Sequence, residues 1–296
     1  MKNKRQQYVL INGKLLPISK ARISPLDYGY LYGFGVFETM RAYKGRIFRL
    51  DAHLERIITS ATKIGIHSHD AHELAACAYK TLEKNHHRDA YIRLTLSAGE
   101  GHIGLNPASC IKPTFVIITK QFSGYPHAKY LTGFKAVTVP ITTNPHSIAS
   151  SLKSNSFLDR LLARARATKN EVDEAVMMTC DGFVAEGSVS NLFIASRGEL
   201  YTPKPSGGIL AGITRNIIFE LANAHRLRIN ERNITLEDVY SSDEAFLTNS
   251  LIEVMPLTKL NNITISSGVA GGLTQSLNEH YSKLVHLETL AHNNMY

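Results

Sequence analysis

The chain has 296 residues, of which 44% are hydrophobic and 20% are charged, a composition typical of a globular protein large enough for two domains. Its apolar runs are shorter than the roughly 20 residues that a membrane-spanning helix needs, and the apolar stretch after the basic N-terminus is too short for a signal peptide, so we expect no membrane association. The net charge of +8 is scattered along the chain, which disfavours nucleic acid and favours a small anionic ligand. The three cysteines show no CxxC or histidine-spaced pattern, which disfavours a disulfide framework or a zinc site and fits a reducing cytoplasm.

Residues 8–17 predict a β-hairpin, because two apolar runs flank Asn12-Gly13, a dipeptide typical of hairpin turns. Three closely spaced glycines between residues 29 and 35 indicate a tight turn or a close approach to a ligand. A helix is predicted from Asp51 onward, with Asp51 as its N-cap, because apolar residues recur at helical spacing between 54 and 66. The other elements predicted in this half are strands at 36–43, 46–50, 90–98 and 112–120 and a helix at 71–84.

Hairpins are also predicted in the second half, around Asp181-Gly182 and Arg197-Gly198. A helix at 157–168 is predicted to turn four apolar side chains toward the core. These side chains are Leu158, Leu161, Leu162 and Ala165. The other elements predicted in this half are strands at 134–140, 243–248 and 253–259 and helices at 214–224 and 270–291.

Strands outnumber helices in both halves and are often joined by hairpins, without the regular strand–helix–strand alternation of a doubly wound parallel sheet. We therefore predict an α+β (α/β) fold with mixed sheets and flanking helices. Residues 122–131 are turn-rich and predict a linker. The sequence thus predicts an N-terminal domain at 1–121 and a C-terminal domain at 132–296.

A lysine, a carboxylate and a glycine-preceded helix start occur in order in the second half. Lys153 lies among small residues, Glu186 precedes Gly187-Ser188, and Gly212-Ile213-Thr214 opens a predicted helix. Pyridoxal 5′-phosphate needs an amine that binds it covalently, a carboxylate at its pyridine nitrogen, and backbone N–H donors for its phosphate. Each residue alone could be an ordinary surface group, so only the combination supports a hypothesis of a pyridoxal-phosphate site. No metal site is predicted.

The sequence resembles the fold-type IV, or class IV aminotransferase, family over about residues 8–260. The motifs that carry the resemblance occur in the family's order and are specific only together. They are Asp27-Tyr-Gly-Tyr-Leu-Tyr-Gly-Phe-Gly-Val-Phe-Glu-Thr-Met-Arg41, His53-Leu-Glu-Arg56, Lys153, Glu186-Gly-Ser-Val-Ser-Asn191, Gly212-Ile-Thr-Arg215 and Thr248-Asn-Ser250. The resemblance implies a two-domain fold like that of D-amino acid aminotransferase, pyridoxal 5′-phosphate as cofactor, a cytoplasmic location, and a homodimer with its active site at the subunit interface.

The resemblance also implies a role for individual residues. Lys153 would bind the cofactor and then move a proton, and Glu186 would pair with the pyridine nitrogen. The residues implied to bind the cofactor are Arg56, Lys153, Glu186, Asn191, Ile213, Thr214 and Ser250, with Arg56, Ile213, Thr214 and Ser250 at its phosphate. The residues implied to bind substrate carboxylates, some from the neighbouring subunit, are Tyr32, Arg41, Tyr91 and Arg93.

Plainer interpretations stay open for several of these residues. Arg56 could be an exposed cation, Tyr32 could serve packing, and Ser250 could simply end a strand. Tyr91 and Arg93, which share one face of a predicted strand, could face solvent. Phe157 stands where aminotransferase relatives often have a tyrosine that bonds the cofactor's phenolic oxygen, which puts that bond in doubt.

The family fold does not decide the reaction. Branched-chain aminotransferases usually have Asp and Gly at the positions of Phe34 and Thr39, whereas Phe-Glu-Thr, Thr248-Asn249-Ser250 and Leu152-Lys153-Ser154 are more similar to 4-amino-4-deoxychorismate lyases. The sequence therefore favours a lyase that releases pyruvate and forms p-aminobenzoate for folate biosynthesis. The alternatives are an aminotransferase acting on branched-chain or D-amino acids and a non-catalytic binding protein of the same fold, which the intact Lys153–Glu186 pair disfavours.

Overall fold

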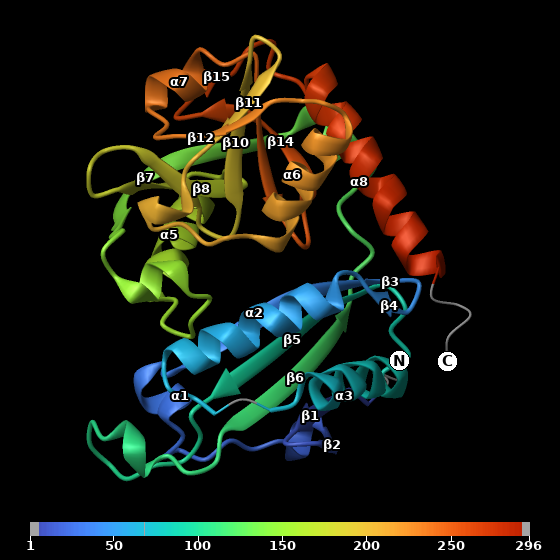
Figure 1. Cartoon of the computed structure of the whole chain (residues 1–296), viewed down its shortest axis with the longest axis vertical. Coiled ribbons are helices and arrows are strands. Elements are labelled where there is room, and N and C mark those ends of the chain that lie inside the picture. Colours follow the sequence, from blue (N-terminus) through green and yellow to red (C-terminus); the bar gives the residue numbers. More distant parts are fainter. Residues whose placement is uncertain (1–5, 68, 292–296) are drawn as a thin grey trace. The chain divides into compact units, whose positions relative to one another are not determined.

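The computed structural model describes residues 6–67 and 69–291 and divides the chain into two compact units (Figure 1). Unit 1 comprises the chain up to Ser123 together with Leu152–Ser156 and the residues from Glu288 onward, and unit 2 comprises Gly124–Ser151 and Phe157–Leu287. The main boundary after Ser123 falls within the predicted linker. The outermost residues of the two predicted domains, 1–5 and 292–296, lie outside the described residues.

Unit 1 is a six-stranded sheet with one face covered by two helices, α2 and α3, which lie side by side (Figure 1). The strand order is β2-β1-β6-β5-β3-β4, and every pairing is antiparallel. The strands are β1 (Tyr8–Ile11), β2 (Lys14–Pro17), β3 (Gly35–Tyr43), β4 (Arg46–Ile47), β5 (Ala90–Ser97) and β6 (Thr114–Gln121). The helices are α1 (Tyr28–Tyr32), α2 (Leu50–Lys63) and α3 (Ala71–Lys84), with short 3₁₀ turns at Ile18–Lys20 and Pro107–Ser109.

The helices of unit 1 begin where backbone and capping residues permit. α3 matches its predicted bounds, because the side chain of Asp70 accepts a hydrogen bond from Glu73 N–H and satisfies one free donor of the first turn. The prediction that Asp51 caps α2 was wrong. Arg49, in a left-handed conformation, is the N-cap, and Asp51 lies in the first turn, where its charge suits the helix dipole.

The glycine-rich stretch predicted as a tight turn contains a short helix, α1. Asp27 caps it by accepting from Gly29 N–H at 2.7 Å, and Gly33 ends it with a φ of 66°, which a residue with a side chain rarely adopts. The turn after α1 leads directly into β3, so these local signals set where β3 begins.

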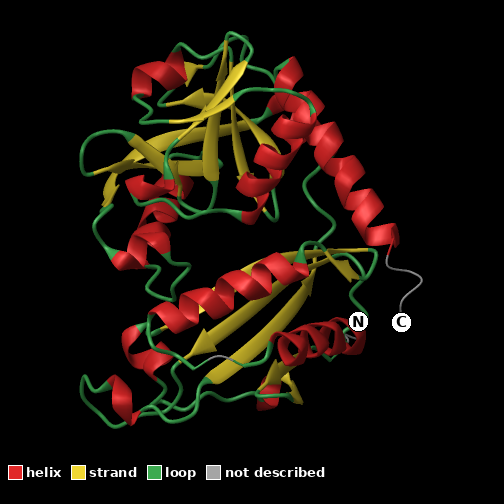
Figure 2. Ribbon diagram, in the orientation of Figure 1, coloured by secondary structure: helices red, strands yellow, loops and turns green. Residues whose placement is uncertain are grey.

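Unit 2 is a nine-stranded mixed sheet with flanking helices (Figure 2). Its path is β12-β11-β10-β13-β14-β7-β8-β9, and β15 pairs with β14. The strands are β7 (Phe134–Thr143), β8 (Glu174–Thr179), β9 (Val184–Gly187), β10 (Asn191–Ser196), β11 (Glu199–Thr202), β12 (Ile229–Glu231), β13 (Glu244–Asn249), β14 (Glu253–Leu260) and β15 (Ile263–Thr264). The helices are α4 (His127–Thr132), α5 (Leu158–Lys169), α6 (Ile213–Ala224), α7 (Leu236–Tyr240) and α8 (Gly272–Ala291), with 3₁₀ turns at Ile148–Ser151 and Pro205–Gly207.

Both hairpins predicted in this half are confirmed, because β8 pairs antiparallel with β9 and β10 with β11. Their connections place Gly182 and Gly198 at positive φ, as tight turns between twisted strands require. β9 and β10 are also joined by a short turn. Glu186 lies before this turn and Asn191 follows it.

The predicted inward face of α5 was wrong. Leu158, Leu161 and Leu162 are 66%, 62% and 49% exposed, and Ala165 is exposed as well. Instead Ala163 and Ala167 are fully buried, in a cluster with residues of β7 and β8. Alanines four residues apart share one helix face and let the helix lie close to the sheet, which leaves the leucines outside.

Candidate active site

Lys153 lies in a segment that pairs with the start of β3, where Ser154 forms an antiparallel bridge with Val36. Its carbonyl accepts from Phe37 N–H at 2.8 Å, and Gly35 carbonyl accepts from Asn155 N–H at 2.8 Å. The Lys153 amine is 4.8 Å from the centroid of the Phe37 ring. A Cβ on Gly35 would lie 2.5 Å from Asn155 Nδ2 and 2.6 Å from Leu96 O, so only glycine permits this close approach. Backbone hydrogen bonds to β3 therefore fix the position of Lys153 along that strand.

Three of the four predicted substrate residues lie in one row of side chains on β3 and β5. In the antiparallel register Thr39 is opposite Arg93 and Arg41 is opposite Tyr91, so their side chains share the sheet face of Phe37. The Arg93 guanidinium is 3.7 Å from the centroid of the Phe37 ring, and the buried Arg41 guanidinium is 4.3 Å from that of Tyr43. The row therefore begins at Phe37, whose ring Arg93 and Lys153 share, and continues along β3 to Arg41 beside Tyr43.

Tyr32 has a different setting. As the last residue of α1 it is 39% exposed, its ring lies edge-on to Tyr28 with 4.8 Å between centroids, and its hydroxyl accepts from Gly104 N–H at 3.3 Å. These contacts account for its position by local packing.

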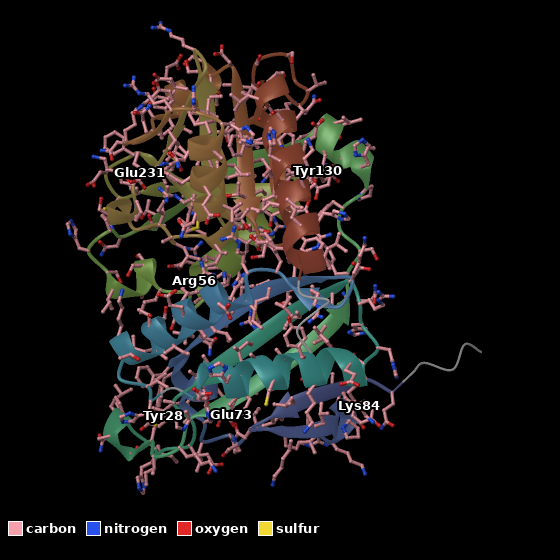
Figure 3. All side chains as sticks on the ribbon, turned by 45° about the vertical axis from the view of Figure 1, so that its right-hand side comes forward. Tyr28, Arg56, Glu73, Lys84, Tyr130 and Glu231 are labelled. Carbon is pink, nitrogen blue, oxygen red and sulfur yellow. The ribbon has the colours of Figure 1, made fainter. Side chains whose placement is uncertain are left out.

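Arg56, on α2 (Figure 3), forms a two-pronged ion pair with Glu38. Its Nε and NH2 donate to the two carboxylate oxygens at 2.6 and 2.7 Å, and His53 Nδ1 lies 2.7 Å from Glu38 Oε2. Burial opposes ionisation of Glu38, but the charges and hydrogen bonds of Arg56 and His53 outweigh it and hold the pKa of Glu38 at about 2, against an ordinary 4.5. Burial lowers the pKa of His53, against the attraction of Glu38.

Glu38 and His53 were not among the predicted site residues, although both stand in the quoted motifs. Their pairing with Arg56 could not be read from those motifs, because it depends on α2 packing across β3. The two bonds to Glu38 fix the orientation of the Arg56 guanidinium. Arg56 is thereby held in one orientation, as a residue at a phosphate site needs to be.

Glu186, the predicted partner of the pyridine nitrogen, lies near the end of β9 and is 2% exposed. Its carboxylate accepts from Arg160 NH2 at 2.5 Å, from Asn191 Nδ2 at 3.1 Å and from Leu210 N–H at 3.2 Å. Asn191 Nδ2 also donates to Leu210 carbonyl at 2.8 Å. Arg160 was missed by the sequence analysis, since a helix arginine 26 residues away carries no local signal. The structure thus holds an oriented, buried carboxylate at this position.

The start of α6 has the features of an anion site. Gly212 is its N-cap, no side chain caps it, and Thr214 is 3% exposed. A Cβ on Gly212 would collide with Asn191 Oδ1, so glycine is required where the helix meets the residue that supports Glu186. Uncapped N–H groups of a twelve-residue helix suit a phosphate.

Ser250 follows β13 in a turn organised by Asn249. Asn249 Oδ1 accepts from the N–H groups of Leu251 and Ile252 at 2.8 and 2.9 Å, and its Nδ2 donates to Val189 carbonyl at 2.9 Å. Asn249 therefore shapes the turn that presents Ser250. Phe157 is the N-cap of α5, with the Arg160 guanidinium 5.5 Å from its ring centroid.

The described parts of the chain contain no group of three or more His, Cys, Asp or Glu side chains placed to hold a metal. Within residues 6–67 and 69–291, none of the helices is long and apolar enough to cross a membrane.

The chain is similar to known proteins along most of its length. The family model described as amino-transferase class IV matches residues 35–260. A Methanocaldococcus jannaschii protein with a provisional branched-chain-amino-acid aminotransferase name is 35% identical, covering 93% of this chain and 96% of that protein. The aminodeoxychorismate lyase of Bacillus subtilis is 34% identical, and the match covers 93% of this chain and 94% of that protein. The crystal structure of the T.th. branched-chain amino acid aminotransferase with pyridoxamine 5′-phosphate has a TM-score of 0.90 at 27% identity. The match covers 95% of this chain and 94% of that one.

The chain belongs to the class IV aminotransferase family. It is an enzyme of that family, and the cofactor of the family is pyridoxal phosphate. The residues present fit this cofactor, because a lysine paired with β3, a buried oriented carboxylate and an uncapped helix N-terminus are each of the kind that its amine bond, its pyridine nitrogen or its phosphate requires. The fold-type IV architecture is likewise confirmed, as an α+β fold with two sheets and flanking helices.

Proposed function

We propose that this enzyme is a 4-amino-4-deoxychorismate lyase, which eliminates pyruvate and leaves p-aminobenzoate. The reaction removes one ring proton and expels the enolpyruvyl group, whose enol then becomes pyruvate. The products account for all atoms of the substrate, and aromatisation of the ring makes the elimination strongly favourable. When bound, the cofactor stores the electron pair that the departing proton leaves behind.

Each residue predicted to bind the cofactor has a proposed task. Lys153 binds the cofactor and, once displaced by the substrate amine, removes the proton from the amine-bearing carbon. Glu186 keeps the pyridine nitrogen protonated, and Asn191 aims Glu186. The phosphate is held by Arg56, Ser250 and the N–H groups of Ile213 and Thr214.

The observation that carries the proposal is the row formed by Thr39, Arg93, Arg41 and Tyr91. The substrate has two carboxylates, and the row offers two guanidinium groups and a phenol on the sheet face of Phe37, whose ring lies 4.8 Å from the Lys153 amine. Thr39 adds a half-buried hydroxyl opposite Arg93, where the branched-chain pattern has glycine. A hydroxyl at that place can donate a hydrogen bond to the departing enol oxygen, which a glycine cannot.

A branched-chain aminotransferase is the second candidate. It is favoured by the relatives of that name in both comparisons, and two cationic side chains also suit an amino acid with a second carboxylate. The support from Thr248-Asn249-Ser250 is weaker in the structure than in the sequence, because the Asn249 side chain is used in the turn itself.

The test is to supply purified protein with 4-amino-4-deoxychorismate in the absence of any keto acid and to measure pyruvate and p-aminobenzoate. The proposal predicts equal amounts of both products. In Thr39→Val, which keeps the side-chain shape, we expect the rate to fall about a hundredfold, as when a hydrogen-bond donor to a developing charge is removed. Amino-group exchange between branched-chain or D-amino acids and keto acids, with no pyruvate from 4-amino-4-deoxychorismate, would establish the aminotransferase instead.

We further propose a cytoplasmic homodimer. Each unit exposes large apolar side chains, which on a protein without a partner would face water. In unit 1 these include Tyr30, Ile103 and Leu105, exposed by 74%, 85% and 85%, and in unit 2 the α5 leucines. Sedimentation of the wild type and of Leu161→Glu checks this, since one buried charge at the interface should convert dimer to monomer. A monomeric wild type would exclude the homodimer.

A further inference from the structure

Glu174, the first residue of β8, is a buried carboxylate that the proposed reaction does not use. It is 1% exposed and accepts four hydrogen bonds. The donors are Ser188 Oγ at 2.5 Å, Ala175 N–H at 2.9 Å, Ser190 Oγ at 3.0 Å and Arg164 NH1 at 3.2 Å. Burying a carboxylate costs several kcal/mol unless its oxygens are bonded, so every oxygen here is matched to donors.

Two of these donors belong to the turn between β9 and β10. Gly187 N–H donates to Ser190 carbonyl at 2.6 Å, and Ser188 N–H donates to Ala175 carbonyl at 2.8 Å. A Cβ on Gly187 would collide with Ser190 Oγ and lie 3.1 Å from Glu174 Oε2. The turn is therefore folded around the Glu174 carboxylate, with no room for a side chain at Gly187.

The same turn sets the position of Glu186. Glu186 precedes it and Asn191 follows it, and Asn191 Nδ2 donates to Glu186 Oε2. Arg160 connects the turn to Glu186, because its NH1 donates to Ser188 carbonyl at 3.1 Å and its NH2 donates to Glu186 Oε1. A shift of the turn would therefore move the Ser188 carbonyl, which holds Arg160, and the Asn191 side-chain amide. Both Arg160 and Asn191 orient Glu186.

We propose that Glu174 is a positioning residue for Glu186, acting through Ser188 and Ser190 rather than by touching the cofactor. This inference rests on the proposed role of Glu186 at the pyridine nitrogen. Removing the Glu174 charge loosens the turn, lets Glu186 leave its orientation and weakens the protonation of the cofactor nitrogen.

The test uses the full-length protein with Glu174→Gln, which keeps the shape of the side chain but removes one acceptor. Glu244→Gln is the matched control. Glu244 likewise accepts hydrogen bonds within unit 2, from Leu273 N–H and from the N–H and hydroxyl of Thr274, but these donors lie at the start of α8, away from the Glu186 turn. The two readouts are the dissociation constant of pyridoxal phosphate and the ¹⁵N chemical shift of its labelled pyridine nitrogen.

We expect Glu174→Gln to weaken cofactor binding about tenfold, within the range of coupled contacting residues, and to move the ¹⁵N shift toward that of neutral pyridine. Glu244→Gln should change neither. In a Glu186→Gln background, Glu174→Gln should have no further effect on either readout, because it acts through Glu186. If Glu174→Gln does not fold, Ser190→Ala removes one bond to Glu174 and should shift both readouts in the same direction by less.

An unchanged ¹⁵N shift in a folded Glu174→Gln protein would overturn the inference, as would equal effects of Glu174→Gln and Glu244→Gln. An undiminished effect in the Glu186→Gln background would show that Glu174 does not act through Glu186. If Glu186→Gln alone changes neither readout, the proposed role of Glu186 fails, which is a different result from failure at Glu174.

Discussion

The ion pair between Glu38 and Arg56 should make the stability of this protein depend on pH in a defined window. Glu38→Gln keeps the side-chain shape and removes the charge. Because the pKa of Glu38 falls from 4.5 to about 2 on folding, its ionised form contributes on the order of 3 kcal/mol to stability at neutral pH. A folded-state pKa below the unfolded one means that this contribution is present above pH 4.5 and is lost as the pH falls toward 2.

The assay is urea denaturation of the wild type and Glu38→Gln at several pH values. The stability difference should be largest near neutral pH and should shrink by about 2 kcal/mol between about pH 5 and pH 3, because most of the unfolded-state titration lies in that interval.

Glu55→Gln, on the exposed side of the same helix, is the control and should stay within about 0.5 kcal/mol of wild type at every pH. If the difference in unfolding free energy between wild type and Glu38→Gln does not change with pH, the reasoning is refuted. The charge of Glu38 would then contribute equally to the folded and the unfolded state.

Three further outcomes test the site. Lys153→Ala should abolish the long-wavelength absorbance of bound pyridoxal phosphate and all turnover, and a retained band would exclude Lys153 as the attachment point. Gly35→Ala should cost about 1–3 kcal/mol in thermal or urea unfolding, since its methyl group meets Leu96 O, and an unchanged midpoint would contradict the close packing around Lys153. Gly212→Ala should weaken cofactor binding in a titration by displacing Asn191, whereas Gly207→Ala, with open space around it, should not. Equal effects of these two substitutions would argue against the α6 phosphate site.

Much of the fold follows from local chemistry that a sequence displays. Asn12-Gly13, Asp181-Gly182 and Arg197-Gly198 predict their hairpins because the turn geometry depends on the turn residues themselves. The bounds of α3 are equally local. The wrong face of α5 has a different cause, because a leucine stripe and an alanine stripe occupy different sides of one helix, and only the neighbouring sheet decides which is buried.

The candidate site shows the same limit. Lys153, Glu186 and the start of α6 were predicted from motif order, but the side chains that orient Glu186 and its turn come from distant positions. Arg160 and Glu174 are ordinary charges in the sequence, and their contacts appear only when α5 and β8 bring them to the β9–β10 turn. Residues that touch a cofactor leave a pattern in the sequence, whereas residues that orient them leave little.

The lysine segment has a consequence for how far the chain can be divided. Leu152–Ser156 belongs to the unit built from the first 123 residues, although the sequence on both sides of it belongs to the other unit. A fragment that stops at Ser123 would leave Phe37 N–H, inside a sheet, without the Lys153 carbonyl that it bonds in the whole chain. The two units are therefore not interchangeable modules, and a cut at the main boundary would separate the amine from the sheet that positions it.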